Sequence, residues 1–192
     1  MFIVSYIYGV VFPIEEIAEY CRENSIFLVE DAAESYSGNN YNGDSKAVMT
    51  LFSFGSIKRC TSFGGALSFV RDPEIYKKMV EVHNTFPVQT KTEFLSKLVR
   101  SLVMATVLNN TKANYRFRST SNLFNFNYKE FAVHNLRGFA PAKDFLGKFN
   151  KQPCVSLLAL LYNRLKHFDP EAFEATNKKI IVSVNKNIGS KE

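Results

Sequence analysis

The stretch Thr50–Val70 reads TLFSFGSIKRCTSFGGALSFV, two apolar runs joined by a more polar connection. Short apolar runs bounded by glycine are typical of buried strands. The connection begins at Gly55, carries Lys58, and ends in the pair Gly64-Gly65. The stretch therefore predicts a strand, a turn and a second strand, with a lysine at the joint. Such a lysine is either a solvated loop residue or an amine held where a cofactor can reach it.

The residues that precede this stretch predict two parallel strands joined by a helix. Phe2–Tyr8 and Ser25–Val29 are apolar runs, and the second ends in the acidic pair Glu30-Asp31. Between them, Pro13–Glu23 places its apolar residues at helical spacing. Because both strands are apolar throughout, this order predicts a right-handed strand–helix–strand unit in a buried parallel sheet.

The residues that follow predict mainly helices. Asp72 and Pro73 fit the N-cap and first position of one helix, and Phe94–Leu108 and Lys151–Lys166 predict two more. We therefore expect an α/β region with a mostly parallel sheet, followed by a helical region. The predicted divisions are residues 1–86 for the α/β region, 87–179 for the helical region and 180–192 for a disordered tail.

Composition excludes several classes of function. The 192 residues include three separated cysteines without a CxxC pair, so we expect no metal site. The net charge of +6 is scattered and predicts no nucleic-acid partner. The apolar segment 94–109 is short and is interrupted by Lys97 and Arg100, which favours an amphipathic helix over a membrane span. We expect a cytoplasmic protein with no membrane partner.

Three chemically useful side chains fall where strands of the predicted sheet end. Asp31 closes one strand, Ser53 ends the next, and Lys58 lies in the turn beyond. Ligands of open α/β sheets bind at the carboxyl ends of the strands. A carboxylate can hold a pyridine nitrogen protonated, a hydroxyl can bind a phosphate oxygen, and an amine can form a Schiff base with an aldehyde. This set suits a pyridine-type cofactor.

The motif VEDAAES…FSFGSIKRCTSFGGAL resembles the DegT/StrS family of pyridoxal-phosphate-dependent sugar aminotransferases. An acidic pair, two small residues, Phe-Ser-Phe, a lysine five positions after the serine and Gly-Gly follow in the family's order. The preceding run YGVVFPIEEIAEYCRENSIFLVEDAAE matches the approach to the aspartate. The resemblance covers roughly residues 2–86 and implies part of a large domain of the pyridoxal-phosphate-dependent transferase fold (fold type I), truncated at both ends.

The resemblance also implies roles for four residues. Lys58 would form the internal aldimine with pyridoxal 5'-phosphate and move the proton, and Asp31 would pair with the pyridinium nitrogen. Ser53 would contact the phosphate. Glu34 stands where the family usually has glutamine near the ring hydroxyl, and a second carboxylate there would be repelled unless it is protonated or turned away.

A lysine at position 58 favours transamination, because relatives that remove a sugar hydroxyl carry histidine there. The implied reaction moves an amino group from an amino acid such as glutamate to a keto sugar linked to a nucleotide, in a homodimer. Two alternatives stay open. The chain is such an aminotransferase or a fragment of one, or it is a catalytically inactive remnant that acts as a binding protein. Each residue alone has a plainer interpretation: Asp31 as a helix N-cap, Lys58 as a solvated lysine.

Overall fold

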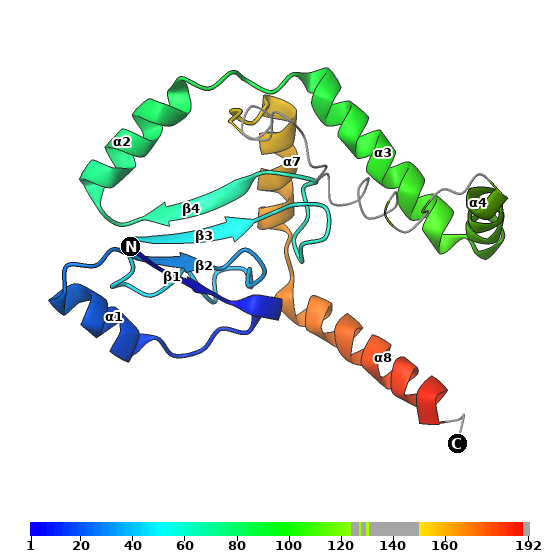
Figure 1. Cartoon of the computed structure of the whole chain (residues 1–192), viewed down its shortest axis with the longest axis horizontal. Helices are drawn as coiled ribbons and strands as arrows, with labels where there is room; N and C mark the ends of the chain where they lie inside the picture. The colour runs from blue at the N-terminus through cyan, green and yellow to red at the C-terminus, as the bar shows by residue number, and fades with distance from the viewer. Residues whose placement is uncertain (124–126, 128–129, 131–149, 190–192) are drawn as a thin grey trace.

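The computed structural model describes residues 1–123, 127, 130 and 150–189. One four-stranded sheet lies at its centre, in the order β1-β2-β3-β4 (Figure 1). The strands are β1 (Phe2–Ser5), β2 (Leu28–Asp31), β3 (Met49–Ser53) and β4 (Ala66–Val70). The helices are the 3-10 turn η1 (Ile7–Gly9) and α1 (Glu15–Glu23), α2 (Pro73–Asn84), α3 (Lys91–Asn109), α4 (Thr111–Leu123), α7 (Val155–Lys166) and α8 (Pro170–Gly189).

The sheet is mostly parallel, as the sequence predicts. β1 pairs with β2 and β2 with β3 in parallel, whereas β4 returns antiparallel to β3. The connection between β3 and β4, residues 54–65, contains no helix, whereas parallel neighbours are usually joined by a helical crossover. The strand–turn–strand prediction for residues 50–70 is therefore confirmed as an antiparallel pair.

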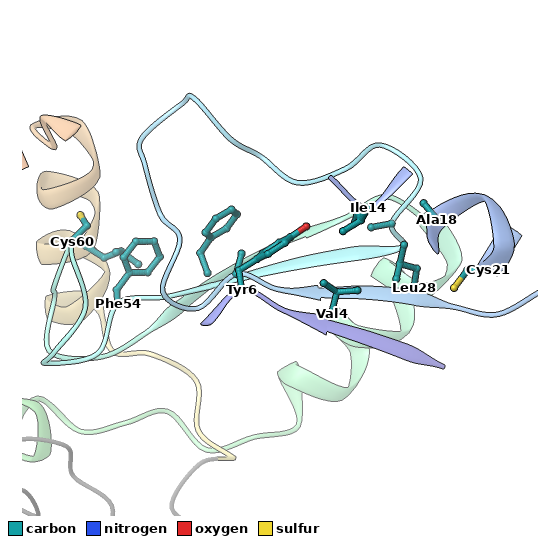
Figure 2. Packing of buried hydrophobic residues seen from close by; sticks show 12 residues of the cluster. Val4, Tyr6, Ile14, Ala18, Cys21, Leu28, Phe54 and Cys60 are labelled. Atoms are coloured by element: carbon teal, nitrogen blue, oxygen red, sulfur yellow. The ribbon is translucent and has the colours of Figure 1, made fainter. Parts of the chain in front are cut away.

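One face of the sheet carries the core. Val4 and Leu28 point to this face, and α1 packs Ala18 and Cys21 against it (Figure 2). Phe52 belongs to the same buried cluster. All five side chains are almost completely buried. The helical spacing predicted for residues 13–23 therefore describes the side of α1 that meets the sheet.

The prediction of a sheet buried on both faces is wrong for the other face. Ile3 on that face is 53% exposed, and Asp31, Leu51 and Ser53 are only partly buried. β1 lies at the edge of the sheet, and within the described residues no side chain on this face is fully buried. A continuous apolar run thus indicates a strand but does not reveal how many of its faces are covered.

The helical predictions after the sheet are confirmed. Asp72 caps α2 by accepting hydrogen bonds from the amides of Glu74 and Ile75. Thr90 and Glu93 form a capping box at the start of α3. In the part of the chain that the structure describes, no helix is both long enough and apolar enough to cross a membrane.

The C-terminal residues differ from the predicted disordered tail. α8 continues to Gly189, so residues 180–189 are helical, and residues 190–192 lie outside the described part. Figure 1 shows α8 extending away from the sheet.

Candidate functional site

The predicted cofactor-site residues lie where β2 and β3 end. β2 and β3 run parallel, so Asp31 and Ser53 close neighbouring strands at the same edge of the sheet. Side chains alternate along a strand, and Asp31 pairs in register with Leu51, two residues before Ser53. Asp31 and Ser53 therefore belong to the same, partly open face of the sheet. We call Asp31, Glu34, Ser53 and Lys58 the strand-tip site.

Backbone hydrogen bonds of one residue, Phe54, close the turn that carries Lys58. The Phe54 amide donates to the Gly65 carbonyl at 3.0 Å, and the Phe54 carbonyl accepts from the amides of Ser62 and Gly64, each at 3.0 Å. Gly65 has a φ of +83°, in the left-handed region that favours glycine. The glycine pair thus lets the chain reverse into β4 while Lys58 stays near the end of β3.

Gly55 lies between Ser53 and Lys58 in space as well as in sequence. A Cβ atom on Gly55 would lie 3.9 Å from Ser53 Oγ and 3.9 Å from Lys58 Cγ. Those two atoms are therefore no farther apart than twice that distance. The Ser53 hydroxyl and the Cγ atom of Lys58 therefore lie near the same point beside Gly55.

Lys58 forms an ion pair with Glu34. Its Nζ atom lies 3.3 Å from Glu34 Oε1, and the lysine side chain is only 18% exposed, whereas that of Glu34 is 43% exposed. The sequence predicted that the Glu34 carboxylate would be repelled near the ring hydroxyl of the cofactor unless it is protonated or turned away. In this structure Glu34 faces the amine, so it is placed as the counterion of Lys58.

Asp31 has two weaker hydrogen bonds. Its Oδ1 accepts from the Ala33 amide at 3.2 Å and its Oδ2 from the Ser5 hydroxyl at 3.3 Å. The first bond resembles the local capping that the plainer interpretation of Asp31 expects. Since a carboxylate has about four acceptor positions, Asp31 retains capacity for a further donor. Ser5 is a site neighbour that sequence reasoning missed, because only the pairing of β1 with β2 brings it to Asp31.

A second carboxylate centre, also missed from the sequence, surrounds Glu30. Its carboxylate is fully buried and accepts from Tyr6 Oη at 2.7 Å, Thr50 Oγ1 at 2.7 Å, the Asp44 amide at 2.8 Å and the Tyr41 hydroxyl. We call these five residues the Glu30 network. Burial, followed by hydrogen bonding to Tyr41, raises the pKa of Tyr6 above its ordinary value. The donors come from separate segments of the chain, so no local sequence motif predicts them.

An open cavity of about 290 Å³ adjoins the Glu30 network and not the strand-tip site. Its lining includes Tyr6, Phe12, Tyr41 and Asp44. None of the four strand-tip residues lines it. The roles predicted for Asp31, Glu34, Ser53 and Lys58 therefore depend on their mutual placement and stay predictions.

Comparisons with known proteins point to one family. The model of the DegT/DnrJ/EryC1/StrS aminotransferase family matches residues 2–120, more than half of the chain. No curated protein matches the chain at the stringency applied.

Solved structures include similar aminotransferases. One is TlmJ from Streptoalloteichus hindustanus, with 25% identity, a TM-score of 0.39, and coverage of 45% of this chain and 24% of that one. Another is Helicobacter pylori PseC, an aminotransferase involved in the biosynthesis of pseudoaminic acid, with 14% identity, a TM-score of 0.38, and coverage of 85% and 65%. The chain thus spans about a quarter of TlmJ and less than two thirds of PseC.

With TM-scores this low, neither likeness adds to the family match. That match includes the whole sheet, the turn with Lys58 and the first helices after it. It also spans both strand ends that carry the strand-tip site. The chain belongs to the DegT/DnrJ/EryC1/StrS aminotransferase family.

Proposed function

We propose that this chain is the cofactor-binding part of a pyridoxal-phosphate-dependent aminotransferase. The proposed reaction transfers an amino group from an amino acid, such as glutamate, to a keto sugar linked to a nucleotide. As the resemblance implies, the proposed enzyme is cytoplasmic, forms a homodimer and acts on small molecules. Family membership supports the reaction type. The observation that carries it is the placement of an acid, an alcohol and a shielded amine at one edge of the sheet.

The residues present fit pyridoxal phosphate. Asp31 retains acceptor capacity on a strand end, where it can hold a proton on a ring nitrogen. Ser53 can donate its hydroxyl proton to a phosphate oxygen. Lys58 can bond to an aldehyde carbon once it leaves Glu34, and its low exposure keeps most water from the amine. When bound, the cofactor supplies the electron sink for the chemistry at the substrate carbon.

Absorbance after addition of pyridoxal phosphate tests this proposal. We expect the wild-type chain to develop a band near the edge of the visible range, and Lys58→Ala to lose it. Lys46→Ala is the matched control, since Lys46 also forms an ion pair with a glutamate, Glu19, but far from the strand ends. A folded wild-type chain without the band, or a Lys58→Ala chain that keeps it, would overturn the proposal.

The second candidate function is that of an inactive remnant that binds a partner. The partly open sheet face, with Ile3 at 53% exposure, favours this alternative. The same titration separates the two candidates, because a remnant would fold without forming a bond between Lys58 and the aldehyde. The neighbouring coding sequence offers a further check: an upstream segment that encodes the remaining strands of the family would favour the enzyme.

A further inference from the structure

Both carboxylate oxygens of Glu34 are engaged at the strand-tip site. Oε1 lies 3.3 Å from Lys58 Nζ, and Oε2 accepts a hydrogen bond from the Tyr8 amide at 3.0 Å. These partners lie 24 and 26 positions away in the sequence, on either side of β2. The tertiary fold therefore orients the Glu34 side chain from two directions, and one of them is the amine proposed to bind the cofactor.

The backbone that follows β1 supports this orientation. Tyr8 has a φ of 60° and Gly9 a φ of 75°, so two consecutive residues adopt left-handed conformations. A Cβ on Gly9 would lie 2.5 Å from the Glu34 carbonyl oxygen and 2.6 Å from Arg59 Nη2. Glycine is needed here because the turn passes so close to Glu34 and Arg59. The close approach brings the Tyr8 amide within reach of the Glu34 carboxylate.

The charges around Lys58 come from three elements. Glu34, after β2, is its direct partner, and Asp31 at the end of β2 accepts from Ser5 and Ala33. Arg59, in the same turn as Lys58, donates from Nη2 to the Tyr8 carbonyl at 3.4 Å. Only Glu34 therefore contacts the amine with an opposite charge among the described residues.

This contact has a chemical consequence. An amine attacks an aldehyde through its lone pair, which the protonated ammonium form lacks. The nitrogen must therefore leave the Glu34 carboxylate, and lose its proton, before it can bond to an aldehyde carbon. We propose that Glu34 is a lock on Lys58: the ion pair holds the side-chain nitrogen on the carboxylate, and the free energy needed to break that pair slows capture of any aldehyde. The lock acts on the same lysine as the proposed function and makes Glu34 a positioning residue for it.

Reductive methylation tests the lock without pyridoxal phosphate. The Lys58 nitrogen attacks the formaldehyde carbon, water leaves, and cyanoborohydride delivers hydride to the resulting carbon–nitrogen double bond. Mass spectrometry of the Lys58 peptide measures the rate, with exposed Lys77 as an internal reference. In Glu34→Gln the amide oxygen can still accept from Tyr8, but the negative charge is gone. Glu16→Gln, an exposed glutamate on α1, is the matched control.

We expect Glu34→Gln to methylate Lys58 about twofold to fivefold faster than wild type near pH 7, the range for a partly exposed ion pair. Glu16→Gln should match wild type. Equal or slower methylation in folded Glu34→Gln would overturn the lock.

Ionic strength gives a second measurement that needs no folded variant. Salt screens a partly exposed pair, so high salt should accelerate methylation of Lys58 relative to Lys77 in the wild-type chain. A ratio that does not change with salt would also overturn the lock. Because neither experiment contains the cofactor, their failure is distinct from failure of the absorbance test of the proposed function.

Discussion

Glu30 and Asp31 are neighbours on β2, yet they serve two different regions of the molecule. Glu30 points to the core face, is fully buried, and accepts four hydrogen bonds. Asp31 points to the open face and accepts two, each longer than 3.1 Å. The carboxylate on the core side of β2 therefore has its acceptor positions filled, whereas the carboxylate on the open side can accept a further hydrogen bond.

This difference distinguishes a carboxylate that stabilises the fold from one that is available to a ligand. A buried carboxylate is tolerated only when donors replace the water that it loses. The Glu30 network supplies these donors and so connects β2 to β3, to the residue that follows β1 and to the loop between β2 and β3. In the strand-tip site, Asp31 retains acceptor capacity that the proposed function would use. Mutations in the network should therefore change the free energy of unfolding, whereas mutations in the site should spare it.

The largest effect is expected for Glu30→Ala. The change leaves the hydroxyl groups of Tyr6 and Thr50 without their buried acceptor, which should lower the free energy of unfolding by about 3 kcal/mol or more. Asp31→Ala should cost less than about 1 kcal/mol, because its donors can turn to water. Urea denaturation measures both. Equal losses would show that the two carboxylates do not differ as proposed.

A glycine beside the Glu30 network gives the next test. Gly43 has a φ of +92°, and a Cβ there would lie 1.9 Å from Thr50 Oγ1 and 2.7 Å from Glu30 Oε2. Gly43→Ala should therefore cost about 1–3 kcal/mol through backbone strain and displacement of the network. Gly55→Ala at the strand-tip site is the control. Its Cβ would meet no atom closer than 3.9 Å, so we expect a change within about 0.5 kcal/mol. A reversed order would contradict the comparison.

Alkaline pH should weaken the network. Burial raises the pKa of Tyr6 and of Tyr41 above the ordinary value, so both keep their protons in the folded chain after the unfolded chain has lost them. The stability that they contribute is complete below the unfolded pKa of about 10 and is lost as pH rises above it. Above that pH, each tyrosine can lower the free energy of unfolding by up to about 1.4 kcal/mol for each pH unit.

Urea unfolding at pH 9 and pH 11 would measure this loss. Tyr6→Phe should reduce the slope, although it also loses a hydrogen bond at neutral pH. Tyr20→Phe, at a residue that is 61% exposed, should leave the slope as in wild type. A slope that Tyr6→Phe does not change would place the alkaline sensitivity outside the network.

The smallest expected effects come from two matched hydroxyl deletions. Thr50→Val removes a buried hydroxyl that donates to Glu30 Oε2 at 2.7 Å and accepts from Arg71 Nη1 at 3.0 Å, and should cost about 1–2 kcal/mol. Ser5→Ala removes an exposed donor to Asp31 and should cost less than about 0.5 kcal/mol. Thermal unfolding of the two variants provides the measurement. A costly Ser5→Ala would show that Asp31 is structural too.

Much of the fold is readable along the chain because its signals are local. Asp72 and Pro73 indicate the start of α2, because they are typical of an N-cap and of a first helical position. The helical spacing of apolar residues indicates the buried face of α1. The strand-tip site was also predictable in part, since Asp31, Ser53 and Lys58 follow strand ends. The partners of these residues were not predictable, because they lie on other segments. Ser5 reaches Asp31 only when β1 pairs with β2.

The sequence by itself determined the order of strands and helices from β1 to α2, the glycine turn after β3 and the family. These depend on neighbours within a few positions, where backbone preferences act directly. Only the tertiary structure decided that Glu34 faces Lys58, that Glu30 is surrounded by donors, and that one sheet face stays partly open. The contacts of Glu34 and Glu30 join residues 11 to 26 positions apart, as in the bond from Thr50 to Glu30. Such contacts form only when packing brings distant segments together, and no local pattern encodes their distance.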